Sequence, residues 1–167
     1  MFALLKQAQP NGCRVVFDNN FRPKLWPDRK LAKEIYLQAF AACHTALITL
    51  DDHQAVFESN SLEEALVHAK SLTIPELVIK RGAENTLVRP EKTKEWLSIP
   101  TLSVQQVIDT TAAGDAFAAA YLSRRLCGAS AHRAAEFGNA VASRVIQYRG
   151  ALIPEDAIQD LISSPVY

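Results

Sequence analysis

The sequence predicts an α/β fold in which a mostly parallel sheet carries helices on both faces. Short apolar stretches, of the length of buried strands, alternate with longer stretches whose apolar residues recur at helical spacing. This alternation favours parallel strands joined by helical crossovers. The 167 residues suffice for one compact domain, and no repeat or linker divides them. We therefore expect a single domain over residues 1–167.

The strands and helices follow from local signals. Strands are predicted at residues 15–17, 46–49, 77–80 and 104–108, with a hairpin formed by 86–89 and 95–99. Helices are predicted at 1–9, 27–42, 61–70, 114–126 and 130–148, with short helices beginning at Asp51 and Pro154. Ser61, with Glu64 three positions later, is a capping box, and Ser130 is a further N-cap. The predicted core positions of the 27–42 helix are Leu31, Ile35, Tyr36 and Ala39.

Composition excludes several classes of function. Lys plus Arg and Asp plus Glu each total 18, without a basic stripe, which argues against nucleic-acid binding. No stretch approaches the ~18 apolar residues of a membrane span. The start lacks the features of a signal peptide. Cys13, Cys43 and Cys127 are widely separated, as expected of reduced thiols in a cytoplasmic protein.

The segment that carries chemistry is Asp109 to Phe117, DTTAAGDAF, between a predicted strand and a helix. Small residues at 112–114 let the backbone approach a ligand, and N–H groups at a helix start bind anions. Asp115 in the first turn is placed to accept the proton of an attacking hydroxyl. The alternative is structural: Asp115 complements the helix dipole and the small residues allow tight packing.

DTTAAGDAFAAAYL resembles the C-terminal signature of the ribokinase (PfkB) family of carbohydrate kinases, usually written DTxGAGD. The resemblance implies a ribokinase-like three-layer fold, with ATP as phosphoryl donor and Mg²⁺ as its metal. It also implies that Asp115 is the catalytic base and that the amides of Ala112, Ala113 and Gly114 form an anion hole. Ala112 stands where the family has Gly, and N–H donation survives the added methyl group if φ stays negative.

Residues 17–26, FDNNFRPKLW, resemble the FDxNxRxxLW segment of the branch of that family acting on 2-keto-3-deoxygluconate. A guanidinium at the carboxyl edge of a sheet binds a carboxylate in bidentate fashion, so Arg22 is the candidate for the sugar acid. Asp18 and Asn20 either order this loop or face the phosphates. Surface and turn roles for these three residues remain the alternatives. Residues 147–151, QYRGA, resemble a segment near the end of that branch.

The expected nucleotide site rests on the resemblance. Lys80 to Asn85, KRGAEN, falls where the family has KxGxxG, a loop over the ATP phosphates and ribose. Asn85 replaces the last Gly and tolerates a left-handed backbone. The nucleotide-binding candidates are Lys80, Gly82, Asn85, Val107, Ile108 and Asn139, with Ala142 beside them. A core role is an equal alternative for Val107, Ile108 and Ala142.

The expected magnesium site departs from the family pattern. The NxxE motif falls on Asp51-Asp52-His53-Gln54, so both of its defining residues are replaced. Asp51 and Asp52 are candidates to act on Mg²⁺ through water, because that ion usually keeps several waters. The alternative is that they serve only as a helix N-cap.

Family members are roughly double this length, so the resemblance implies that the N-terminal half and the lid over the sugar are absent. The expected partners are ATP and a sugar acid, together with a second copy or a separate first half that completes the sheet. Two alternatives stay open. One is another sugar kinase, such as a fructokinase. The other is a catalytically silent nucleotide-binding or interaction module.

Overall fold

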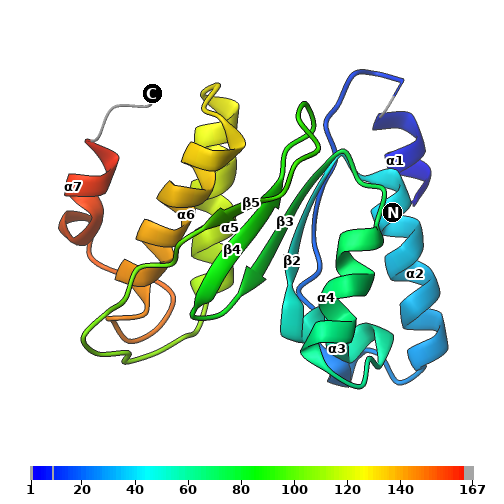
Figure 1. Ribbon diagram of the computed structural model, residues 1–167, viewed down its shortest axis with the longest axis horizontal. Coiled ribbons are helices and arrows are strands. Elements are labelled where there is room, and N and C mark those ends of the chain that lie inside the picture. The colour runs from blue at the N-terminus through cyan, green and yellow to red at the C-terminus, as the bar shows by residue number, and fades with distance from the viewer. Residues whose placement is uncertain (1, 9, 164–167) are drawn as a thin grey trace. The chain divides into compact units, whose positions relative to one another are not determined.

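The computed structural model describes residues 2–8 and 10–163. They form two compact units (Figure 1). The first unit comprises Met1–Arg81 and Arg89–Glu95, and the second comprises Gly82–Val88 and Trp96–Tyr167. Within the described residues, no helix combines the length and the apolar character that a membrane crossing requires.

The first unit is built on three parallel strands. Strand β2 lies between β1 and β3, with Val16 opposite Thr45 and Thr45 opposite Glu76. Its elements are α1 (Phe2–Ala8), β1 (Val16–Asp18), η1 (Pro23–Leu25), α2 (Arg29–Ala42), β2 (Thr45–Thr49), α3 (Leu50–Phe57), α4 (Leu62–Ser71) and β3 (Glu76–Arg81). The strands and helices predicted for this part are therefore confirmed, although residues 1 and 9 of the first predicted helix lie outside the described residues.

Side-chain caps explain where α2 and α4 begin. The Asp28 carboxylate accepts the Leu31 N–H at 3.0 Å, and the Ser61 hydroxyl accepts the Glu64 N–H at 3.1 Å.

The predicted core of α2 is partly wrong. Leu31 is 48% exposed, whereas Ala32 and Phe40 are buried. The buried stripe is thus shifted around the helix relative to the predicted one.

The second unit pairs two antiparallel strands and packs two long helices together. Strands β4 and β5 form the predicted hairpin, with Thr86 opposite Ile99. Gly138 of α6 faces the Phe117 ring of α5 so closely that a Cβ atom at position 138 would lie only 2.7 Å from a ring carbon. The elements are β4 (Glu84–Arg89), β5 (Leu97–Ile99), α5 (Ala113–Leu126), α6 (Ala131–Val145), η2 (Glu155–Ile158) and α7 (Gln159–Ile162).

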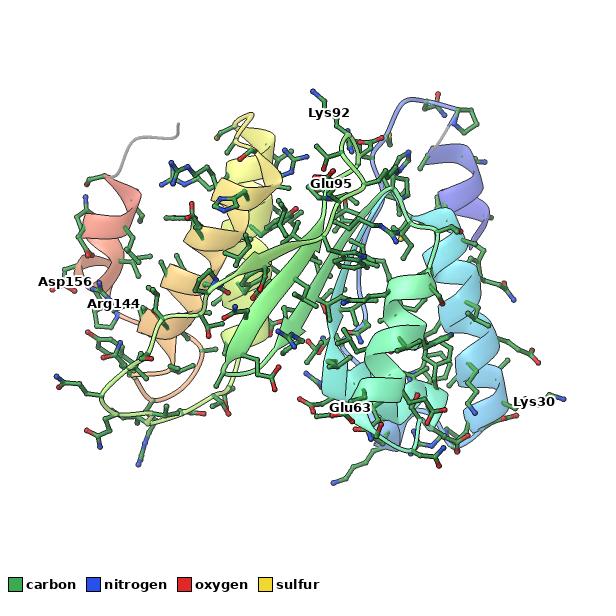
Figure 2. The ribbon with its side chains drawn as sticks, viewed as in Figure 1. Lys30, Glu63, Lys92, Glu95, Arg144 and Asp156 are labelled. Carbon is green, nitrogen blue, oxygen red and sulfur yellow. The ribbon has the colours of Figure 1, made fainter. Side chains whose placement is uncertain are left out.

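Two predictions for the second unit are wrong. Residues 104–108 form no strand; instead, the Ile108 N–H donates to the Ile146 carbonyl at 2.8 Å, just beyond α6. Helix α6 ends at Val145, three residues before the predicted end. Arg144 near that end reaches toward the C-terminal segment (Figure 2). It donates to the Ala157 carbonyl and pairs with Asp160.

Candidate functional site

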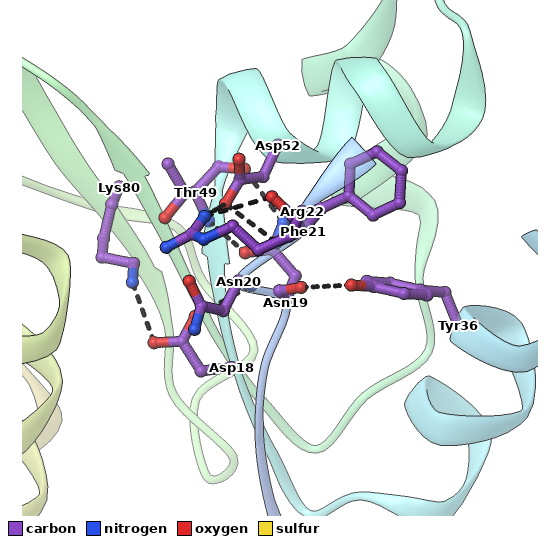
Figure 3. A network of polar contacts seen from close by, with 9 residues as sticks. All are labelled: Asp18, Asn19, Asn20, Phe21, Arg22, Tyr36, Thr49, Asp52 and Lys80. Atoms are coloured by element: carbon purple, nitrogen blue, oxygen red, sulfur yellow. Dashed lines mark hydrogen bonds and ion pairs between the residues drawn. The ribbon is translucent and has the colours of Figure 1, made fainter. Parts of the chain in front are cut away.

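The loop after β1 is fixed by Asn19, which is almost fully buried (Figure 3). Its side-chain amide donates to the Thr49 carbonyl at 3.0 Å and accepts the Thr49 N–H at 2.9 Å, so it extends the β1–β2 ladder by one rung. The Tyr36 hydroxyl donates to the Asn19 carbonyl at 2.6 Å. Burial raises the pKa of Tyr36 to about 12, which keeps this donor protonated. Sequence reasoning missed Asn19, whose only signal was its place directly after the strand.

Arg22 follows a residue that is held on several sides. The Phe21 ring is 1% exposed, contacts Tyr36 edge to face at 5.7 Å and lies 5.1 Å from the Arg29 guanidinium. The Phe21 N–H donates to Asp52 Oδ2 at 3.1 Å. Arg22 Nη1 donates to the Phe21 carbonyl at 3.1 Å, while the Arg22 side chain stays 57% exposed. The guanidinium therefore remains accessible to an anion from solvent.

Asp18 and Lys80 were predicted in two separate segments of the chain, and the structure brings them together. Lys80 Nζ lies 3.0 Å from Asp18 Oδ2, although the two residues are 62 positions apart in the sequence. Lys80 is buried, so the carboxylate compensates an ammonium that has little access to water. The other Asp18 oxygen accepts the Asn20 N–H at 3.3 Å. Asp18 thus orders the loop backbone, and an ammonium has donors left for a further acceptor.

Asp51 and Asp52 lie in the first turn of α3, and Thr49 occupies the N-cap position, so the N-cap role considered for the two aspartates is wrong. Asp51 is exposed, whereas burial raises the pKa of Asp52 against the opposing effects of the Phe21 N–H and Arg22. Across residues 2–8 and 10–163, no group of three or more His, Cys, Asp or Glu side chains is arranged to hold a metal ion. That Asp51 and Asp52 act on Mg²⁺ through water stays a prediction.

In the second unit, the start of α5 has an unusual backbone. Ala112 is the N-cap and has φ 58° and ψ 12°, in the left-handed region, so the condition of a negative φ is not met. The Ala113 N–H donates to the Thr110 carbonyl at 3.2 Å. For the N–H groups of Gly114 and Asp115, no acceptor lies among the residues that the structure describes. Asp115 itself is exposed in the first turn.

Asp109 holds the loop that leads into α5, a role that sequence reasoning did not assign. One carboxylate oxygen accepts the Thr111 N–H at 2.8 Å, and the other accepts the Gly150 N–H at 2.9 Å. Hydrogen bonds from Thr111 and then from Gly150 lower the pKa of Asp109 to about 2. Asp109 thus stays ionised and ties the 109–115 loop to the chain just beyond α6.

The nucleotide candidates of the second unit divide into two sets. Val107 and Ile108 are 55% and 52% exposed, and both are accessible to a ligand. Asn139 is buried: its oxygen accepts the Thr86 hydroxyl at 2.8 Å and its nitrogen donates to the Pro100 carbonyl at 2.9 Å. The amide of Asn139 thus serves to join α6 to the hairpin.

The expected turn at Asn85 is also different. Asn85 lies within β4 and donates to the Ser98 hydroxyl, and the left-handed turn residue is Gly82, with φ 61°. The expectation of a left-handed Asn85 is wrong, because the strand begins one residue before it.

Comparison with solved structures assigns the fold to the class of ribokinase-like carbohydrate kinases. Aminoimidazole riboside kinase from Salmonella enterica, complexed with aminoimidazole riboside and an ATP analogue, matches with a TM-score of 0.80 and 25% identity, over 97% of this chain and 57% of that one. Ribokinase from Thermotoga maritima matches with a TM-score of 0.70 and 21% identity, over 96% of this chain and 52% of that one. The predicted α/β, ribokinase-like fold is confirmed.

Residues 1–158 match the pfkB family of carbohydrate kinases, and the chain belongs to that family. The 2-dehydro-3-deoxygluconokinase of Escherichia coli K12 is 40% identical over 160 residues, which are 95% of this chain and 52% of that protein. The chain spans about half the length of the curated relatives it matches.

Proposed function

We propose that this chain carries the catalytic part of an ATP-dependent kinase for 2-keto-3-deoxygluconate. The name of the E. coli relative gives the same compound under its synonym 2-dehydro-3-deoxygluconate. The observation that carries the proposal is the start of α5. There an exposed Asp115 stands beside backbone N–H groups that lack acceptors within the described part of the chain, in a member of the pfkB family. Phosphoryl transfer depends mainly on positioning and on stabilising negative charge, and these groups supply both.

The proposed chemistry assigns one task to each group of the second unit. The terminal hydroxyl of the sugar acid attacks the γ-phosphorus of ATP, the bond to ADP breaks, and the hydroxyl proton passes to Asp115. The amides of Ala112, Ala113 and Gly114 were the predicted anion hole. We propose that the Gly114 and Asp115 amides contribute most, because the Ala113 N–H already donates to Thr110. Val107 and Ile108 offer apolar surface to the adenine.

The first unit supplies charge for the ligands. We propose that Arg22 binds the substrate carboxylate, because its guanidinium is more than half exposed and matches a carboxylate in shape. Lys80 of the first unit is proposed for the nucleotide phosphates, and Gly82 and Asn85 of the second unit are proposed for the phosphates and ribose. Asp51, acting through water, would help to hold Mg²⁺, which would neutralise negative charge on the transferring phosphoryl group. We further propose a cytoplasmic location, which suits three unpaired cysteines.

ADP release by the purified chain tests this proposal. The chain is mixed with MgATP and either 2-keto-3-deoxygluconate or fructose, beside Asp115→Asn and Arg22→Ala. We expect turnover of the sugar acid, a loss of about 100-fold or more in Asp115→Asn, and a raised KM for the sugar acid in Arg22→Ala. A rate that rises with the square of chain concentration would indicate that two copies complete the site.

Two other results point to the alternatives. Equal use of fructose, unaffected by Arg22→Ala, would indicate a kinase for neutral sugars. ATP binding without turnover, in a chain shown by circular dichroism to be folded, would indicate a nucleotide-binding module and would refute catalysis by this chain alone.

A further inference from the structure

One carboxylate oxygen of Asp52 contacts two different groups of the loop that carries Arg22. Its Oδ2 atom accepts the Phe21 N–H at 3.1 Å, and the same atom lies 3.9 Å from Arg22 Nη1 (Figure 3). The first distance is a hydrogen bond, whereas the second is too long for one. Asp52 therefore fixes the backbone that carries Arg22 and attracts its charge, without occupying the guanidinium donors.

The Arg22 guanidinium is held at one end only. Nη1 donates to the Phe21 carbonyl at 3.1 Å, and among the described residues no acceptor lies within hydrogen-bond distance of Nη2 or Nε. A carboxylate that binds in bidentate fashion needs two such N–H groups side by side. If Asp52 itself formed a close bidentate pair with Arg22, it would compete with the ligand for these donors. The observed distance avoids that competition.

The residues before Arg22 are held by hydrogen bonds and by packing. Asn19 is bonded to Thr49 and Tyr36, and the Phe21 ring is buried against Tyr36 and Arg29. The Phe21 amide is the last backbone group before Arg22 that is tied to another element. Asp52, at the start of α3, supplies that tie.

We infer that Asp52 is a positioning residue, which presents the Arg22 guanidinium to the carboxylate of a sugar acid. This inference rests on the proposed function for the choice of ligand. It assigns Asp52 a role in substrate specificity, in place of the role on Mg²⁺ that its sequence position suggested. A preset guanidinium loses less freedom on binding, so the gain in affinity is confined to ligands that bear a carboxylate.

The test measures binding of 2-keto-3-deoxygluconate to the full chain and to Arg22→Ala, Asp52→Ala, Asp52→Asn and the Arg22→Ala/Asp52→Ala double variant. We expect Asp52→Ala to weaken binding about tenfold, and Asp52→Asn to weaken it less, because the amide oxygen still accepts the Phe21 N–H. The double variant should bind no more weakly than Arg22→Ala. Glu63→Gln, an exposed acid in the first turn of α4, is the matched control and should bind like the parent.

Hydrogen exchange of the Phe21 amide is measured in parallel and needs no ligand. Exchange accelerated by Asp52→Ala, but not by Glu63→Gln, is expected. Unchanged exchange, additive losses in the double variant, or an increased Mg²⁺ requirement with unchanged affinity for the sugar acid would each overturn the inference. If the parent chain does not bind the sugar acid, the proposed substrate fails, and the exchange rates alone then decide whether Asp52 fixes the loop.

Discussion

Replacement of Ala112 by glycine should stabilise the protein, because the native backbone there is unfavourable for any residue with a Cβ atom. Ala112 has φ 58° and ψ 12° at the N-cap of α5. A left-handed conformation costs an L-residue about 1–2 kcal/mol, and glycine avoids this cost. Glycine also has more conformational freedom in the unfolded chain, which destabilises the folded state by about 0.4–1 kcal/mol and offsets part of that gain. The net gain is about 0.5–1 kcal/mol, or a rise in Tm of about 1–4 °C.

Urea and thermal unfolding, followed by far-UV circular dichroism, measure this gain. The matched control is Ala113→Gly, one position later and inside α5, where the same change should lower the free energy of unfolding by about 0.5–1 kcal/mol. The two variants differ only in the backbone conformation of the replaced residue, so their effects should have opposite signs. Equal destabilisation by both would refute the argument that Ala112 is left-handed in the folded protein.

Two further predictions concern stability. Gly138→Ala should lower the free energy of unfolding by about 1–3 kcal/mol in urea, because the new methyl group would lie 2.7 Å from the Phe117 ring. This clash outweighs the gain of about 1 kcal/mol that alanine brings in helix propensity. A more stable variant would contradict this packing. Burial, and then the neighbouring His68, lower the pKa of His53 from 6.5 to about 3, so the unfolded chain binds a proton that the native state does not. Stability should be complete above pH 6.5 and fall by up to about 1.4 kcal/mol per pH unit toward pH 3. His53→Gln should flatten this pH profile and His132→Gln should not; two superposable profiles would exclude His53 as the cause.

The predictions that succeeded rest on short-range chemistry. Ser61 and Ser130 cap their helices as expected, since a cap involves a side chain and an amide three residues later. The predicted strand at 104–108 failed for the opposite reason. Its apolar residues look like a buried strand, but whether they find a partner strand depends on distant parts of the chain, and here Val107 and Ile108 stay exposed.

The sequence by itself determined the alternation of strands and helices, the caps, and the segments that carry Arg22 and Asp115. Each of these depends only on residues that are close together in the sequence. Only the tertiary structure decided which side chains meet. It placed Lys80 against Asp18, gave Asp52 the Phe21 amide, and buried Asn139 against Thr86. It also put Ala112 in a left-handed conformation, against its intrinsic preference. These outcomes depend on how whole elements pack, and the free energy of packing can override local preferences that are worth only about 1 kcal/mol.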